Sequence, residues 1–112
     1  MELRTSDFLN WLLRQKKGSV VGNPWQAGLC PVARWLQDDH AIVASVFYQG
    51  YYAADVPDEM LPLPEDLVEL QHEFDHEFDV DLYQDPDELE VTREAALMCL
   101  YRVIINRNGW LE

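Results

Sequence analysis

The chain has 112 residues, of which 48% are hydrophobic and 13 are aromatic (4 Trp, 5 Tyr and 4 Phe), and it carries a formal net charge of −13 at pH 7. This length fits a single globular domain over residues 1–112 that buries its own core, and the aromatic content excludes a disordered acidic chain. No apolar stretch reaches the roughly 18 residues that span a membrane, and the first residues lack a basic-then-apolar signal layout, so we expect a cytoplasmic protein.

The N-terminal third predicts two helices. A first helix is expected over about residues 7–17, with Ser6-Asp7 as its cap. A short second helix is expected over about residues 31–37, because proline suits the first helical position, and Cys30 precedes it as the N-cap residue. The Gly-containing residues 18–29 between the two helices read as a loop.

The middle of the chain predicts a small β-hairpin. Residues 41–48 are rich in Ile, Val and aromatic side chains, which favours a strand. Gln49-Gly50 suits a turn, after which residues 51–54 return as the partner strand. Residues 59–64, which contain two prolines, read as a linker.

The C-terminal half predicts two more helices separated by an acidic loop over residues 79–90. The third helix is expected over residues 64–78, with an apolar stripe at the helical period. That stripe consists of Leu67, Leu70, Phe74 and Phe78. Thr92 caps a fourth helix that ends near Asn106. The expected fold is therefore α+β and mostly helical, in the order α-α-β-β-α-α, with one small antiparallel hairpin packed on the helices.

The negative charge is concentrated in the middle of the chain. Residues 38–90 contain 17 Asp or Glu and no Lys or Arg, whereas residues 1–37 and 91–112 carry net charges of +3 and +1. Such a block repels itself and lowers folding stability. It argues against direct binding to nucleic acid or to an anionic membrane, and it predicts a basic partner protein for an acidic face contributed mainly by residues 55–90.

The third helix and the loop after it contain a row of carboxylates that we take as the candidate interaction site. The row consists of Glu65, Glu69, Glu73, Asp75, Glu77 and Asp79. Its charge density is comparable with that of DNA, which has one charge per roughly 1.7 Å of axis. Tyr48, Tyr51 and Tyr52 add an aromatic contact surface around the hairpin tip. The leading hypothesis is a non-enzymatic acidic interaction domain without a cofactor, and in its sharper form a nucleic-acid mimic that inhibits a nucleic-acid-binding protein. The alternatives without an enzymatic role are self-association with the basic N-terminal third and a merely solubilising surface.

An alternative function is that of a zinc-dependent hydrolase. His72-Glu73-Phe74-Asp75-His76 resembles the H-E-x-x-H motif of zinc-dependent proteases, in which the two His bind zinc and the Glu is the general base. A third ligand would have to be a carboxylate such as Asp79, Glu90 or Glu94. The helical period directs His72 and His76 away from the apolar stripe, toward a face that we expect to be solvated.

A further alternative is a divalent-cation site in the loop over residues 79–90. Its twelve residues lie between two predicted helices and resemble an EF-hand calcium loop. Oxygen ligands stand at positions 1, 3, 9 and 12, which are Asp79, Asp81, Asp87 and Glu90. Position 6 is Gln84, where the sharp turn requires glycine, so an acidic turn that binds cations loosely is the competing interpretation.

The two cysteines give no disulfide framework, and we expect both thiols to be reduced. The position of Cys30 at a helix start would lower its pKa through the helix dipole, but we favour a buried structural thiol over a nucleophile. Cys99 lies among apolar residues of the fourth helix and is expected in the core.

Four short runs resemble a group of small uncharacterised bacterial proteins. The runs are Phe8-Leu9-x-Trp11-Leu12, Val21-Gly22, Cys30-Pro31-Val32-Ala33-x-Trp35-Leu36 and Val91-Thr92-x-x-x-Ala96-Leu97. The resemblance implies a bacterial or phage origin and one small domain, and it implies no activity.

Overall fold

The computed structural model describes residues 3–24, 26–78 and 89–108, without the side chains of residues 75, 76 and 108. In this part of the chain the order of elements is α1 (Thr5–Arg14), β1 (Val20–Gly22), α2 (Pro31–His40), β2 (Ala44–Val46), β3 (Gly50–Ala53), β4 (Val56–Pro62), α3 (Glu65–Glu77), β5 (Val91–Thr92) and α4 (Arg93–Asn108). The α+β class is confirmed, with four helices and two antiparallel sheets among the described residues. About half of these residues are helical, so the expectation of a mostly helical fold holds only loosely. The predicted order lacked β1, β4 and β5.

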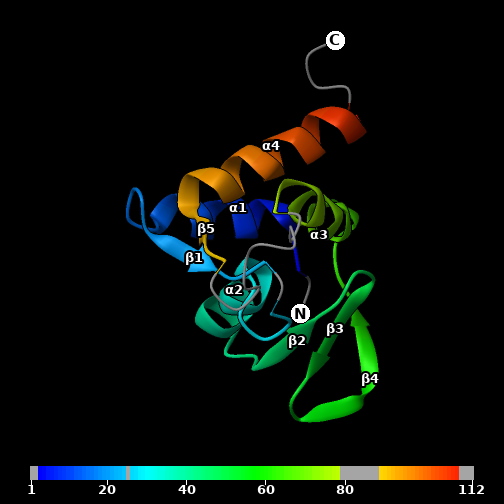
Figure 1. Cartoon of the computed structure of the whole chain (residues 1–112). Helices are drawn as coiled ribbons and strands as arrows, with labels where there is room; N and C mark the ends of the chain where they lie inside the picture. Colours follow the sequence, from blue (N-terminus) through cyan, green and yellow to red (C-terminus); the bar gives the residue numbers. More distant parts are fainter. Residues whose placement is uncertain (1–2, 25, 79–88, 109–112) are drawn as a thin grey trace.

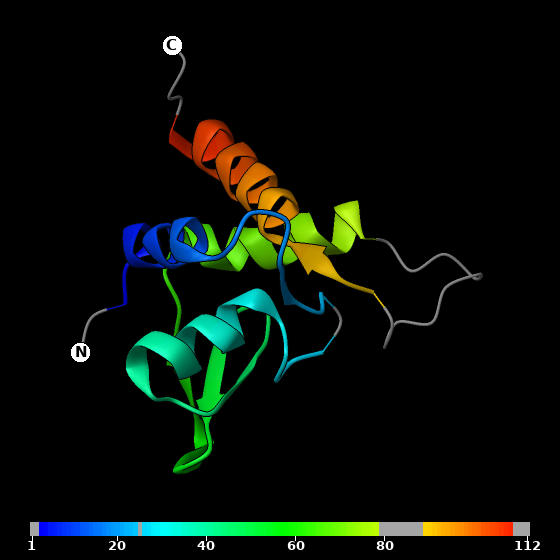
Figure 2. The ribbon, with the colours of Figure 1, turned by 90° about the vertical axis from the view of Figure 1, so that its left-hand side faces the viewer.

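The elements fall into two groups (Figures 1 and 2). Helices α1, α3 and α4 gather at one end of the molecule, and the three-stranded sheet β2-β3-β4 lies at the other end beside α2. The short ladder between β1 and β5 lies at the side of the helical group. One hydrophobic cluster runs through both groups, from Phe8 of α1 and Trp35 of α2 to Leu100 of α4.

The start of α2 follows the predicted chemistry, whereas that of α1 does not. Pro31 is the first residue of α2, and the Cys30 sulfur accepts a hydrogen bond from the Ala33 amide at 3.5 Å, as an N-cap residue does. Helix α1 begins two residues earlier than predicted and ends at Arg14. The predicted Ser6-Asp7 cap is wrong, because these residues lie within the first turn and Arg4 occupies the N-cap position without a side-chain cap bond.

The predicted hairpin is confirmed, but it is part of a larger sheet. Strands β2 and β3 pair in register, and the Phe47 amide donates to the Gly50 carbonyl at 2.8 Å, so the turn is Tyr48-Gln49 rather than Gln49-Gly50. Strand β4 then adds to β3, where the sequence suggested a linker. Prolines are tolerated there because β4 is one of the two edge strands of this sheet.

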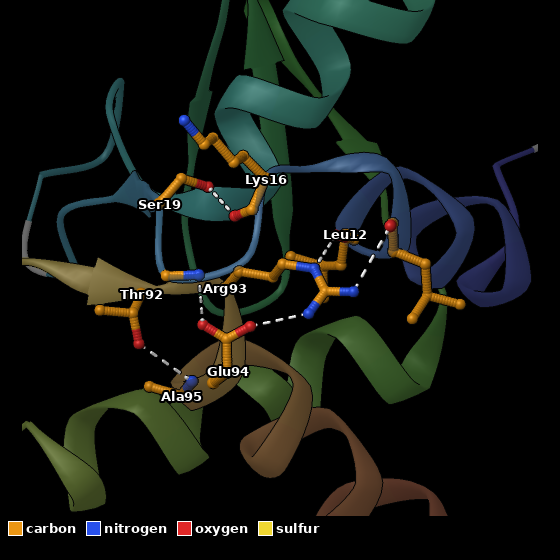
Figure 3. Close-up of polar contacts among 9 residues, drawn as sticks. Leu12, Lys16, Ser19, Thr92, Arg93, Glu94 and Ala95 are labelled. Atoms are coloured by element: carbon orange, nitrogen blue, oxygen red, sulfur yellow. Dashed lines mark hydrogen bonds and ion pairs between the residues drawn. The ribbon is translucent and has the colours of Figure 1, made fainter.

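A node around Arg93 joins the two ends of the chain (Figure 3). The Arg93 guanidinium donates to the carbonyls of Leu12 and Leu13, which are 81 and 80 residues away in sequence, and its backbone amide donates to the Ser19 carbonyl. A cation at the end of α1 matches the negative end of that helix dipole. Glu94 accepts from the Gly18 amide at 2.8 Å and from Arg93 at 2.7 Å.

The predicted cap of α4 is confirmed, since the Thr92 hydroxyl accepts from the Ala95 amide at 3.2 Å. Helix α4 continues to Asn108, two residues beyond the predicted end. The apolar stripe of α3 is also confirmed, because Leu67, Leu70 and Phe74 are fully buried.

Gly22 makes a close backbone contact with residues 29–31, which links the Val21-Gly22 run to the Cys30-Pro31 run. A Cβ atom on Gly22 would lie 2.6 Å from the Leu29 carbonyl oxygen, 2.6 Å from the Pro31 nitrogen and 2.8 Å from the Cys30 carbonyl carbon. The backbone of β1 therefore packs directly on the backbone that leads into α2, and only glycine leaves room for this contact.

Candidate interaction surfaces

The acidic row of α3 lies beside α4, and arginines of α4 hold part of it. Arg102 donates to Glu77 at 2.9 Å and to Glu73 at 3.4 Å. Arg107 forms ion pairs with Glu65 at 2.5 Å and with Asp66 at 2.7 Å. Hydrogen bonds to Glu77 and Glu65, in turn, raise the pKa values of Arg102 and Arg107. The row is therefore partly neutralised within the molecule.

The remaining carboxylates of the row are Glu69, Asp75 and Asp79. Glu69 is exposed, and no Lys or Arg of the described residues forms an ion pair with it. The side chain of Asp75 and the whole of Asp79 lie outside the description. Sequence spacing alone could not show which carboxylates face α4, because the arginines that pair with them lie 25 to 42 residues away.

A second group of open carboxylates lies on the β3–β4 hairpin. Asp55, Asp58 and Glu59 are exposed, and none of them belongs to an ion pair with another described residue. Residues 38–90 contain no Lys or Arg, so the neighbouring chain supplies no cation to these carboxylates. They belong to the expected acidic face over residues 55–90.

The aromatic contact surface of the hairpin differs from the predicted one. Tyr51 is only 4% exposed and packs in the core, because its position in β3 faces inward with Val46. Tyr52 is half-buried on the opposite face and packs edge-to-face on Phe47 at 5.8 Å. Tyr48, the third predicted tyrosine, is 47% exposed, and the neighbouring Phe47, which was not predicted, is 48% exposed.

The sheet and the residue before it carry further exposed apolar side chains. A Cβ atom on Gly50 would lie 3.0 Å from the Cγ atom of Met60, so the Met60 side chain lies over Gly50. Met60 and Val43 are 43% and 61% exposed. Apolar side chains and open carboxylates therefore occur together on this sheet.

The zinc motif is described only in part. His72 is exposed and stacks on Tyr48, with ring centroids 4.7 Å apart and planes 6° apart. Glu73, the general base of the zinc hypothesis, accepts from Arg102. The side chain of His76 lies outside the description, and among the described residues no three His, Cys, Asp or Glu side chains form a group that could hold a metal ion.

The predicted calcium loop falls mostly outside the described part of the chain. Asp79, Asp81 and Asp87 are among the residues that are not described, whereas Glu90 is exposed just before β5. The cation hypothesis for this loop therefore stays a prediction.

The prediction of a buried structural thiol is confirmed for both cysteines. Cys30 is 2% exposed, and burial raises the pKa of its thiol to about 11. The hydrogen bonds from backbone amides at the start of α2 act in the opposite direction but do not outweigh the loss of water. Cys99 is fully buried, and burial, followed by the charges of Glu77 and Glu73, raises its pKa to about 11 as well.

A pocket lies at the tip of the β2–β3 hairpin, and we name it the tip pocket. Its volume is about 170 Å³, and it is lined by Pro24, Gln26, Ala27, Cys30, Val46, Phe47, Tyr48 and Gln71. The loop wall is fixed to the sheet because the Val46 amide donates to the Ala27 carbonyl at 2.8 Å. Sequence reasoning missed this pocket, since its walls come from three separate segments and share no local motif.

Comparisons of the chain with protein-family models, curated proteins and solved structures gave no match. In the described ranges, no helix combines the length and apolar character needed to cross a membrane.

Proposed function

We propose that the protein is a non-enzymatic acidic interaction domain that acts in the cytoplasm, without a cofactor, by binding a basic protein. The observation that carries this proposal is the excess of carboxylates for which the chain has no cation. It contains 21 Asp and Glu against 8 Lys and Arg, and arginines of α4 are already paired with carboxylates of α3. A basic partner would supply the missing cations and relieve the repulsion among these carboxylates.

The open carboxylates define where such a partner would bind. Glu69 on α3 and the hairpin residues Asp55, Asp58 and Glu59 are exposed outside the arginine pairs. Exposed aromatic side chains lie on the same hairpin sheet, and aromatic anchors inside a polar rim are typical of protein interfaces. The same net charge disfavours nucleic acid or an anionic membrane as the direct partner.

The sharper proposal is that the basic partner itself binds nucleic acid, so that the acidic face competes with its natural ligand. In this form the binding constant should fall steeply with salt, as for contacts to phosphates. Because Glu65, Glu73 and Glu77 are held by arginines, the mimic would rely more on Glu69 and on the hairpin carboxylates than on the whole row of α3.

The test is a pull-down from the host cytosol at low salt, followed by elution with rising salt. The triple variant Asp58→Asn/Glu59→Gln/Glu69→Gln removes open carboxylates, and Glu65→Gln/Glu73→Gln/Glu94→Gln removes the same charge from paired ones. We expect the first variant to lose a basic protein that the second retains, mainly through a slower association rate. The captured protein should also release its nucleic acid on binding. Capture of no basic protein, or equal loss in both variants, would refute a dedicated acidic surface.

A further inference from the structure

The tip pocket has the size of one bulky side chain. Its volume of about 170 Å³ is below the roughly 300–1,000 Å³ of pockets that hold drug-sized ligands. It is close to the roughly 150 Å³ of an apolar cavity that accepts benzene. Most of its wall is apolar, since Pro24, Ala27, Val46 and Phe47 all line it. A phenyl ring therefore fits its size and its chemistry.

The polar groups of the pocket suit a peptide better than a reactive small molecule. Gln71 is buried, with 8% of the residue exposed, and its side-chain amide donates to the Leu67 carbonyl at 3.4 Å. A primary amide has two donors and one acceptor oxygen, so Gln71 has capacity for a further hydrogen bond to a peptide backbone. Cys30, with a thiol pKa near 11, stays protonated at neutral pH and offers no nucleophile.

Two exposed aromatic side chains line the pocket. Phe47 and Tyr48 are nearly half exposed, and each packs against another ring. Phe47 packs against Tyr52, and Tyr48 stacks on His72 of α3. Aromatic side chains that are already held in place lose little entropy when a partner packs on them.

The charge of the surrounding chain decides which kind of segment would enter. The three segments that form the walls contain no Lys or Arg, and from Asp38 to Glu90 the chain has none at all. Glu69 is exposed on α3 about one helical turn before His72, whose ring stacks on Tyr48 of the pocket wall. Cationic residues on either side of an inserted side chain would therefore be attracted, and acidic ones repelled.

We propose that the tip pocket takes an aromatic or other bulky apolar side chain from a cationic segment of the partner, so that the recognised motif is an apolar residue flanked by Lys or Arg. This inference rests on the proposed function, because it names the chemistry by which a basic protein would be bound. A second copy of the chain is disfavoured as occupant, since its own hairpin would bring carboxylates to the same place.

Three capped tripeptides test the motif by titration into the ¹⁵N-labelled protein. Acetyl-Lys-Phe-Arg-amide carries the anchor and the charge, acetyl-Lys-Ala-Arg-amide lacks the anchor, and acetyl-Glu-Phe-Glu-amide reverses the charge. We expect the first to bind roughly tenfold more tightly than the Ala peptide, which corresponds to burial of one aromatic side chain. It should also bind more tightly than the Glu peptide, because only its flanking charges are attracted to the acidic chain. On addition of this peptide, the protein signals of the Gln71 side-chain amide and of the backbone amides of Ala27 and Val46 should shift.

Two variants locate the binding. Ala27→Phe fills the pocket and should abolish the advantage of the Phe peptide, whereas Ala54→Phe adds the same ring to an exposed turn and should not. Tyr48→Ser removes a ring that is about half exposed, and it should weaken binding of the Phe peptide more than Tyr101→Ser on α4. Equal affinity of the Phe and Ala peptides, or shifts confined to α3 away from Gln71, would overturn the inference. That result would leave the proposed function standing if the cytosol still yields a basic partner, whereas absence of any such partner would remove the proposed function itself.

Discussion

The substitution Gly22→Ala tests the fold, because the added methyl group would clash with three backbone atoms. A carbon atom normally keeps about 3.5–4.0 Å from its neighbours, whereas the added Cβ would lie 2.6, 2.6 and 2.8 Å from atoms of Leu29, Pro31 and Cys30. These neighbours cannot rotate away, because they are backbone atoms leading into α2. We therefore expect a loss of about 3 kcal/mol, at the upper end of overpacking costs, and a fall in Tm of roughly 10 °C.

Gly28→Ala is the matched control. The nearest atom to a Cβ on Gly28 is the Ala44 carbonyl oxygen at 3.9 Å, an ordinary contact, and Gly28 does not have a positive φ. Loss of unfolded-state entropy should then stabilise this variant by up to about 1 kcal/mol. Urea unfolding followed by tryptophan fluorescence measures both. A Gly22→Ala variant as stable as Gly28→Ala would refute the close contact between β1 and the start of α2.

Two further predictions concern the Arg93 node and the buried thiols. Arg93→Ala should cost about 2 kcal/mol in urea unfolding, because the Leu12 carbonyl loses a charged donor. Arg34→Ala, which removes one exposed bond of 3.4 Å, should stay within about 0.5 kcal/mol of the wild type. The folded pKa of Cys30 near 11 exceeds its ordinary value of 9.0, so stability is complete below pH 9 and falls as pH rises toward 11. At pH 10 the loss is about 1 kcal/mol relative to pH 7 for this thiol. Cys30→Ser should show a correspondingly smaller change between the two pH values, and an unchanged pH difference would contradict the raised pKa.

Local signals predicted the helices well, because helix starts depend on neighbouring residues. The Cys30-Pro31 start of α2, the Thr92 cap and the apolar stripe of α3 all follow from residues within one or two turns. Strand β4 was missed because its prolines and carboxylates disfavour a strand, and only its edge position explains them. The pair β1–β5 was missed because each strand is only two or three residues long and its partner is about 70 residues away.

The negative charge of the candidate surfaces could be predicted from the sequence, but which of their side chains are exposed and unpaired could not. The excess of carboxylates over residues 38–90 is a property of the sequence. Which of them remain open depends on Arg102 and Arg107, whose positions beside α3 follow from helix packing rather than from spacing. Likewise, alternation alone could not tell which of Tyr51 and Tyr52 faces the core, since a shift of one residue in register would exchange them.

The large sequence separation of the Arg93 contacts determines which parts of the fold can form first during synthesis. Helix α1 is synthesised early. Its C-terminal carbonyls lack the Arg93 donor, and strand β1 lacks its pairing partner, until residues 91–93 have been synthesised. Contacts of such wide separation form slowly, and until then the apolar sides of α1 and α3 lack the cover of α4. During this interval we expect mutual repulsion of the acidic blocks to oppose association of incomplete chains. The same repulsion that lowers the stability of the finished fold would then reduce aggregation of the unfinished one.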